Sequence, residues 1–372
     1  MQWADAARGI AILLVLFGHT CPPPYTTAFI YAFHMPLFFF LSGMFMQIDT
    51  PLRPWLRKRV RTLLVPFVIF NLVLLVSDWC IVALSPNAHT PVDIPGRLMG
   101  TLTGWRSAAW LLFEGTWIHS WNSSLWFLPA LFVAQGLLLI CYRLLNSLSD
   151  PRVSQFPIFN FPLGAKRRST LGELSTCLLS LAGAAYAYYV GLALPMSLDA
   201  ALVATVFLLM GREWLHRGFS GFQTWYWVVV GIVFVVTTLQ NFHSLGGGNN
   251  HVDMSTCTLG QTFNFYIAAT AGSLLMVRAC QKWEGHALQP LFQTACWLGR
   301  NSLCIYCLHR IPMNLGIGIW NAIVMSPAQT SDMFTLSRSL ILLTFTVLLL
   351  VPAVYVVNRW FPWTLGRQTS IH

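Results

Sequence analysis

The stretch Leu340-Ile-Leu-Leu-Thr-Phe-Thr-Val-Leu-Leu-Leu-Val-Pro-Ala-Val-Tyr-Val-Val357 contains no charged residue. A helix needs about 18 to 20 apolar residues to cross the hydrocarbon core of a bilayer, and this stretch reaches that length. Other apolar runs that approach or exceed it recur along the chain. The sequence therefore predicts an all-α, polytopic membrane helix bundle.

The overall composition favours the same fold class. Of the 372 residues, 56% are hydrophobic and only 9% are charged, whereas a soluble domain carries about 25% charged residues. The net charge is +10, but the basic residues lie in short loops between apolar runs, which is the pattern that orients membrane proteins. We therefore expect the lipid bilayer as a partner and no nucleic acid. The nine cysteines follow no disulfide pattern.

The apolar runs predict about ten membrane-spanning helices in a single domain, residues 1–372, and no cleavable signal peptide. The predicted spans lie near residues 6–22, 28–47, 62–84, 124–146, 174–193, 198–213, 224–242, 260–279, 300–324 and 337–359. With the N-terminus in the cytoplasm, all Lys and Arg except Arg97, Arg106, Arg310 and Arg338 become cytoplasmic, which is 18 of 22. Such an alternation predicts cytoplasmic N- and C-termini and a bacterial cytoplasmic (inner) membrane location.

The first predicted helix carries two ionisable residues on nearly one face. Arg8 and His19 are eleven residues apart, which is about 16 Å of helical rise and a net rotation of about 20°. Asp5 lies one turn before Arg8 and is expected to hold its guanidinium. An arginine at the cytoplasmic end suits a phosphate, and a histidine deeper in the membrane suits general base catalysis. The alternatives are a snorkelling arginine and a hydrogen-bonded core histidine.

Two further groups follow the first helix. His34 precedes a helix-kinking Pro36 in an otherwise aromatic and apolar segment, so it is a second candidate for chemistry inside the membrane. The run Arg57-Lys58-Arg59-Val60-Arg61 stands directly before the third span. Such a run binds lipid head groups or orients the chain, or it forms a site for a cytoplasmic polyanion.

Taken in order, these motifs resemble the acyltransferase-3 family of membrane proteins, in particular its fucose 4-O-acetylase-like and xanthan acetyltransferase-like branch. The matching motifs are Asp5-x-x-Arg8-Gly9 with His19, Phe33-His34-Met-Pro-Leu-Phe-Phe-Phe-Leu-Ser42-Gly43, Arg57 to Arg61 with Leu63-Leu-Val-Pro66-Phe67, Ser124-Leu-Trp126-Phe-Leu, and Leu298-Gly-Arg-Asn301-Ser302-Leu-Cys-Ile-Tyr306-Cys-Leu-His309.

The resemblance implies transfer of an acyl group, usually acetyl, from cytoplasmic acyl-CoA to a carbohydrate hydroxyl. It implies functional roles for Arg8 and His19, and an association of Arg57, Arg59 and Arg61 with acyl-CoA. Trp126 and His309 match motif positions without a clear role, and we assign them to substrate binding. The predicted chemistry places His19 as general base, with His34 orienting the acceptor or stabilising the oxyanion. Acetyl-CoA is expected as co-substrate and no metal.

Weaker signals leave alternatives open. Glu114 stands near Trp110, Trp117 and Trp121 and is a candidate for binding a sugar acceptor, although an interfacial aromatic belt explains the same pattern. His309-Arg310 inside a predicted span needs partners or a water-filled cavity. The competing function is a polytopic transporter of a small molecule or lipid-linked sugar, but the sequence shows no inverted repeat and no paired broken helices.

Overall fold

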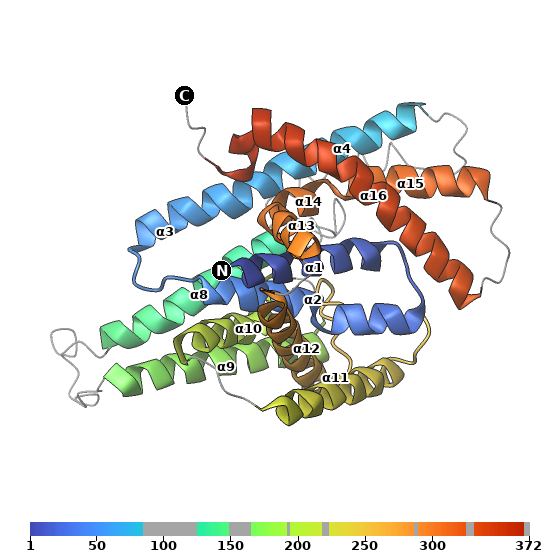
Figure 1. Ribbon diagram of the computed structural model, residues 1–372. Coiled ribbons are helices and arrows are strands. Elements are labelled where there is room, and N and C mark those ends of the chain that lie inside the picture. Colours follow the sequence, from blue (N-terminus) through green and yellow to red (C-terminus); the bar gives the residue numbers. More distant parts are fainter. Residues whose placement is uncertain are drawn as a thin grey trace.

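The computed structural model describes residues 1–84, 125–148, 165–191, 194–217, 223–285, 289–324 and 331–367, and in these residues it is built of helices without a strand (Figure 1). The helices are α1 (Gln2–His19), α2 (Pro24–Met44), α3 (Leu52–Arg59), α4 (Val65–Leu84), α8 (Phe127–Leu148), α9 (Ala165–Tyr189), α10 (Leu198–Arg217), α11 (Thr224–Ser244), α12 (Thr262–Trp283), α13 (Gln289–Arg300), α14 (Ser302–Leu308), α15 (Arg310–Ile323) and α16 (Asp332–Trp360).

Several of these helices have the length and composition to cross a membrane. Among the described residues, five segments qualify: Pro24–Met44, Pro195–Leu215, Thr224–Ser244, Thr262–Trp283 and Asp332–Trp360. The outer helices α11 and α16 expose large apolar side chains such as Ile232 and Leu348, which suits contact with lipid. The predicted all-α membrane helix bundle is confirmed. Each of the ten predicted spans overlaps a helix, while the number that crosses the bilayer stays a prediction.

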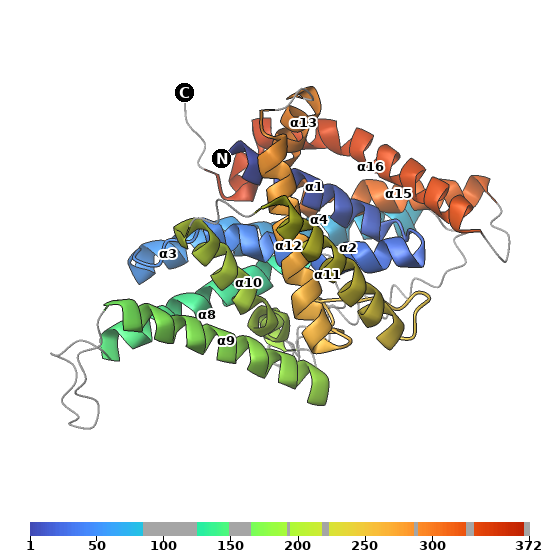
Figure 2. The same cartoon turned by 60° about the horizontal axis from the view of Figure 1, so that its bottom comes forward.

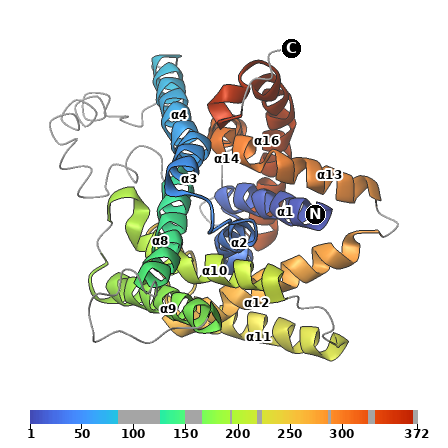
Figure 3. The same ribbon diagram turned by 90° about the vertical axis from the view of Figure 1, so that its left-hand side faces the viewer.

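Helix α1 lies in the middle of the bundle. Figure 3 shows α13, α14 and α16 on one side of α1, and α2, α10 and α12 on the other. The first half of α1 is rich in buried small residues, from Ala4 to Ala11, and small residues let neighbouring helices approach closely. The contact with α13 is the closest, because a Cβ on Gly9 would collide with the carbonyl group of Ala295.

The remaining helices form layers around this centre. Helices α8, α9 and α10 pack against one another below α2, as the turned view in Figure 2 shows, and α11 packs along α12. The start of α1 and the end of α16 lie toward the left of Figure 1, and the α1–α2 turn lies at the right. The basic ends of α1, α3 and α16 therefore share one side of the bundle.

Two short helices lie outside the predicted spans. Helix α3 is amphipathic, with Trp55 buried and Arg53, Arg57 and Lys58 exposed, and a π-helical turn, Val60–Leu64, joins it to α4. Helix α13 buries Phe292, Ala295, Cys296 and Gly299. That spacing follows one face of a helix, so α13 could have been predicted from its own sequence.

Candidate active site

The rings of His19 and His309 stack on each other. Their centroids are 5.2 Å apart and their planes differ by 24°. His19 is the last residue of α1, and His309 stands between α14 and α15. The turn that follows His19 is fixed because the hydroxyl of Ser339 on α16 donates to the carbonyl oxygen of Thr20 at 3.2 Å. The end of α1 is thereby held against the C-terminal third of the chain.

The position of His309 follows from a break in the predicted span 300–324. Pro312 has no N–H to donate to the carbonyl group of Leu308, so the helix is interrupted at His309, whose own backbone stays helical with φ −57° and ψ −29°. The helix is accordingly divided into α14, which ends at Leu308, and α15, which begins at Arg310. The break leaves His309 at the junction, in the interior of the bundle, fully buried.

Local contacts fix the tautomer of His309. Its Nδ1 lies 2.7 Å from the carbonyl oxygen of Tyr306, and because a carbonyl oxygen only accepts hydrogen bonds, Nδ1 carries the proton. Nε2 is then an acceptor, and within the described part of the chain this buried atom has no hydrogen-bond partner. A buried nitrogen without a partner is costly in a structural residue and is expected in a group that meets a substrate.

The predicted candidate His34 reaches the same region from α2. It is buried, and its Nδ1 donates to the carbonyl oxygen of Ile30 at 2.7 Å. Its ring packs edge-on against Tyr31, with the centroids 4.9 Å apart, and it interacts electrostatically with His19. The structure therefore brings His309, from the junction of α14 and α15, together with His19 and His34 of the first two helices.

The loop between α11 and α12 covers this cluster. His251 packs edge-on against Tyr31 at 4.2 Å between centroids, and Asp253 interacts electrostatically with both His19 and Tyr31. Arg310, at the start of α15, interacts electrostatically with His19 and His309. The histidines thus have an acidic and a basic side chain in their surroundings.

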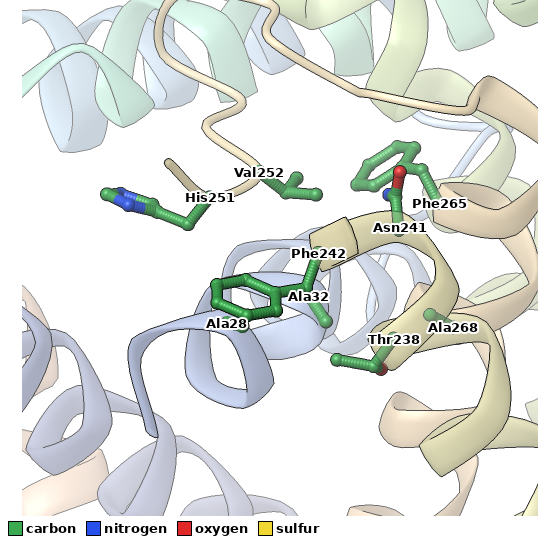
Figure 4. Close-up of a pocket in the computed structure, with 9 residues that line it drawn as sticks. All are labelled: Ala28, Ala32, Thr238, Asn241, Phe242, His251, Val252, Phe265 and Ala268. Carbon is green, nitrogen blue, oxygen red and sulfur yellow. The ribbon is translucent and has the colours of Figure 1, made fainter. Parts of the chain in front are cut away.

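The covering loop is well tied to its helices. Asn241 of α11 donates to the carbonyl oxygen of Leu259 at 2.9 Å and accepts from the N–H of Gln261 at 2.7 Å. Figure 4 shows Asn241 and Phe242 of α11 with His251 and Val252 of the loop around a small cavity that Ala28 and Ala32 of α2 also line. This cavity adjoins the site through His251.

The described part of the loop also contains a buried thiol. Burial is the largest effect on Cys257, and together with the nearby carboxylates of Asp199 and Asp253 it raises the pKa of this thiol. A thiol with a raised pKa carries little thiolate, which is its nucleophilic form. Cys257 is therefore unsuited to act as an acyl acceptor.

Trp126 borders the histidine cluster through two aromatic neighbours. It is buried at the start of α8, beside Phe127. The N–H of Phe127 donates to the hydroxyl of Tyr306 at 3.3 Å, and the Tyr306 ring stacks on His309 with 6.0 Å between centroids. Glu114, the other predicted acceptor residue besides Trp126 and His309, lies outside the described residues.

Arg8 lies near the other end of α1. Its Nη1 donates to Oδ1 of Asp5 at 3.1 Å, so the predicted contact between these side chains is present. The guanidinium also lies over the ring of Phe45, 4.9 Å from its centroid. Both side chains of the pair are about a quarter exposed, at 27% and 26%. Arg8 is thus held in place by two neighbours and keeps access to a ligand.

The basic run lies at the same side of the bundle as Arg8, where α3 meets the π-helical turn. Arg57 is exposed, whereas Arg59 and Arg61 are half-buried. The turn precedes Pro66, which has no N–H and whose ring would clash with the carbonyl group of Thr62 in an ordinary α-helix. Such π-turns commonly occur at functional sites. Arg61 donates from Nη2 to the carbonyl oxygen of Arg367 at 3.1 Å.

Some residues of the site carry no local signal in the sequence. Tyr31 joins the histidines only through tertiary contacts, and the motif that contains Tyr306 does not report its contact with His309. Among the described residues, no group of three His, Cys, Asp or Glu side chains is arranged to hold a metal ion. The chemistry that three imidazoles in a mostly buried site support is proton transfer.

Comparison with protein families gives one match. The family model described as an acyltransferase domain, acyltransferase 3, matches residues 1–359. No curated protein and no solved structure matches the chain. The family match covers all the helices that contribute the histidine cluster, Arg8 and the basic run. The chain therefore belongs to the acyltransferase-3 family and is a membrane acyltransferase.

Proposed function

We propose that this protein is an O-acetyltransferase of the bacterial cytoplasmic (inner) membrane, with both termini in the cytoplasm. It moves an acetyl group from cytoplasmic acetyl-CoA to a hydroxyl of a surface polysaccharide, an oligosaccharide or a lipid-linked sugar. The observation that carries the proposal is the stacking of His19 on His309, with 5.2 Å between the ring centroids. His19 and Arg8 stand on the same helix, α1, about 16 Å apart along its axis.

In this proposal the donor binds at the basic side of the bundle. Arg8, Arg57, Arg59 and Arg61 hold the CoA phosphates, since guanidinium groups match phosphate oxygens with paired hydrogen bonds. The pantetheine arm then carries the thioester along α1 toward His19. The contact between Asp5 and Arg8 supports this arrangement because it keeps the guanidinium oriented.

The proposed reaction is direct acyl transfer. The acceptor hydroxyl attacks the thioester carbonyl carbon while His19 removes its proton, and general base catalysis of this kind contributes about 10² to 10⁴-fold. The carbon–sulfur bond breaks, the proton passes from His19 to the departing thiolate, and the products are the O-acetylated sugar and free CoA. His34 and Nε2 of His309 border the reacting atoms, and as hydrogen-bond acceptors they orient the acceptor hydroxyl. Trp126 supports acceptor binding from the start of α8.

A group-transfer assay separates this function from transport. Purified protein in lipid vesicles is supplied with acetyl-CoA and a bacterial glycan fraction, and release of free CoA is followed with and without the glycan. Release that depends on the glycan supports the acetyltransferase. Uptake of glycan into the vesicles without release of CoA would instead favour the transporter.

A further inference from the structure

The end of the chain reaches the basic run of α3. Residues Pro362–Arg367, here called the C-terminal strap, follow α16 with a short 3₁₀ turn. Gly366 has a φ of +70° and lies so close to the main chain of Arg61 that a Cβ there would collide with the Arg61 carbonyl oxygen. Arg61 in turn donates to the carbonyl oxygen of Arg367 at 3.1 Å. The C-terminal strap therefore belongs structurally to the start of α4 (Figure 1).

The side chain of Arg367 ties the C-terminal strap to two further helices. Its Nη1 donates to Oδ1 of Asn358 on α16 at 2.6 Å, and its Nη2 donates to the carbonyl oxygen of Arg300 at 3.3 Å. Asn358 donates to Oδ1 of Asn301 at 2.8 Å. These bonds hold the guanidinium of Arg367 beside the end of α13, where Arg300 is exposed.

The end of α13 also lies against the start of α1. A Cβ on Gly299 would collide with the carbonyl group of Asp5, so the main chains of these helices touch directly. Arg300 follows Gly299, and Asp5 holds Arg8. The thiol of Cys296 interacts electrostatically with both Asp5 and Arg300, which places these two side chains in one neighbourhood.

Four arginines from four segments thus lie on one side of the bundle with few counter-charges. They are Arg8 of α1, Arg61 of the π-helical turn, Arg300 at the end of α13 and Arg367 of the C-terminal strap. Among the described residues, ion pairs join Arg8 to Asp5 and Arg212 to Glu213, and none involves the other three arginines. The carboxylates in this neighbourhood are those of Asp5 and Glu284, and positive charges that outnumber the nearby carboxylates repel one another. A ligand with several phosphate groups would relieve that repulsion and use the remaining guanidinium N–H groups.

We propose that Arg300 and Arg367 belong to the donor site, so that the C-terminal strap and the end of α13 complete a phosphate-binding surface with Arg8 and Arg61. The ligand class is a nucleoside diphosphate with an additional phosphate, as in acyl-CoA. The inference rests on the proposed function, since it extends the same site to two residues from the other end of the chain. The head group of an anionic lipid offers the same chemistry at a membrane surface, so the test must separate the two.

The test measures CoA binding by the full-length protein in discs of neutral phosphatidylcholine, with Arg300→Gln and Arg367→Gln compared with the wild type. The matched control is Arg53→Gln, because Arg53 is an exposed basic residue on the same helix as Arg57. Both test variants should raise the Kd for CoA about tenfold or more, while Arg53→Gln changes it little. Arg300 accepts the hydrogen bond from Arg367 with its main-chain oxygen, so Arg300→Gln should fold normally. Arg367→Lys preserves the charge and serves as a second variant, which should bind CoA better than Arg367→Gln.

Each outcome decides the inference. Wild-type binding of CoA with unchanged affinity in Arg300→Gln and Arg367→Gln would overturn it and leave the proposed function standing. If these variants lose affinity for phosphatidylglycerol, tested in discs that contain it, but not for CoA, the surface is a lipid site and the inference is wrong. If the wild type binds no CoA, the proposed function fails together with the inference.

Discussion

His19 and His309 lie ring against ring, with 5.2 Å between centroids, although one ends the first helix and the other stands near the end of the chain. His309 has a fixed hydrogen on Nδ1, because that atom donates to the carbonyl oxygen of Tyr306. His19 is partly exposed, whereas His309 is fully buried. This difference suits a pair in which His19 exchanges the proton with the substrate while Nε2 of His309 orients the acceptor hydroxyl.

The role of Nε2 of His309 can be tested with a substitution that keeps a hydrogen-bond donor at the position of Nδ1. In His309→Asn the amide nitrogen can still donate to the Tyr306 carbonyl oxygen, but the group at the position of Nε2 is lost. We expect folded protein with kcat lowered by about tenfold or more and little change in KM for acetyl-CoA. Steady-state kinetics in lipid vesicles measure kcat and KM separately. Full activity of His309→Asn would show that Nε2 has no part in the reaction.

The ion pair between Asp5 and Arg8 predicts which of two substitutions raises KM for acetyl-CoA more. Arg8→Gln removes the charge that binds phosphate, whereas Asp5→Asn only frees the guanidinium of Arg8. We therefore expect KM for acetyl-CoA to rise more in Arg8→Gln than in Asp5→Asn. Because both side chains are about a quarter exposed, the stability cost of losing the ion pair should stay within about 1 kcal/mol. The reverse order of KM values would contradict the role given to Arg8.

The contact between α1 and α13 predicts a packing defect. A methyl group at Gly299 would overlap the carbonyl group of Asp5, and forced overpacking costs about 1 to 3 kcal/mol. Gly299→Ala should therefore lower the temperature at which the purified protein loses its monodisperse elution profile. Gly318→Ala in α15 is the control, since nothing lies within 4 Å of a Cβ built there. Equal thermal stability of the two variants would argue against the close crossing of α1 and α13.

The orientation of the bundle can be tested with the cysteines. Cys21 is exposed in the turn after α1, whereas Cys257 is buried in a loop where burial and two carboxylates raise its pKa. With the N-terminus in the cytoplasm, a membrane-impermeant maleimide added outside spheroplasts should label a variant that keeps only Cys21. A variant that keeps only Cys257 should react much more slowly, because little thiolate is present. Labelling of Cys21 only after the membrane is opened would reverse the topology.

Much of the fold could be predicted because long apolar runs determine where helices form in a membrane. The helices α3 and α13 were not predicted, because they are short and carry polar residues, although the buried residues of α13 follow a helical period. The break at His309 was also missed, even though Pro312 signals it. Proline alone does not decide such a break, because Pro36 and Pro352 lie inside the continuous helices α2 and α16.

The site itself could be predicted only in part. Arg8, His19 and Asp5 stand on one helix, so their relation follows from helical geometry. The meeting of His19 with His309, or of Arg61 with Arg367, depends on how distant helices pack, and no local pattern reports that. Tyr31 looks ordinary in the sequence and gains meaning only because the loop after α11 folds over α2.

The most direct measurement follows label from radioactive acetyl-CoA into the glycan fraction in membranes that contain wild type, His19→Ala or His243→Ala. The three proteins are matched for folded material, and His243 is the control because it is an exposed histidine in the last turn of α11. We predict transfer by the wild type and by His243→Ala, and a loss of about 10² to 10⁴-fold in His19→Ala. Transfer at the wild-type rate by correctly folded His19→Ala would contradict the assignment of His19 as the base.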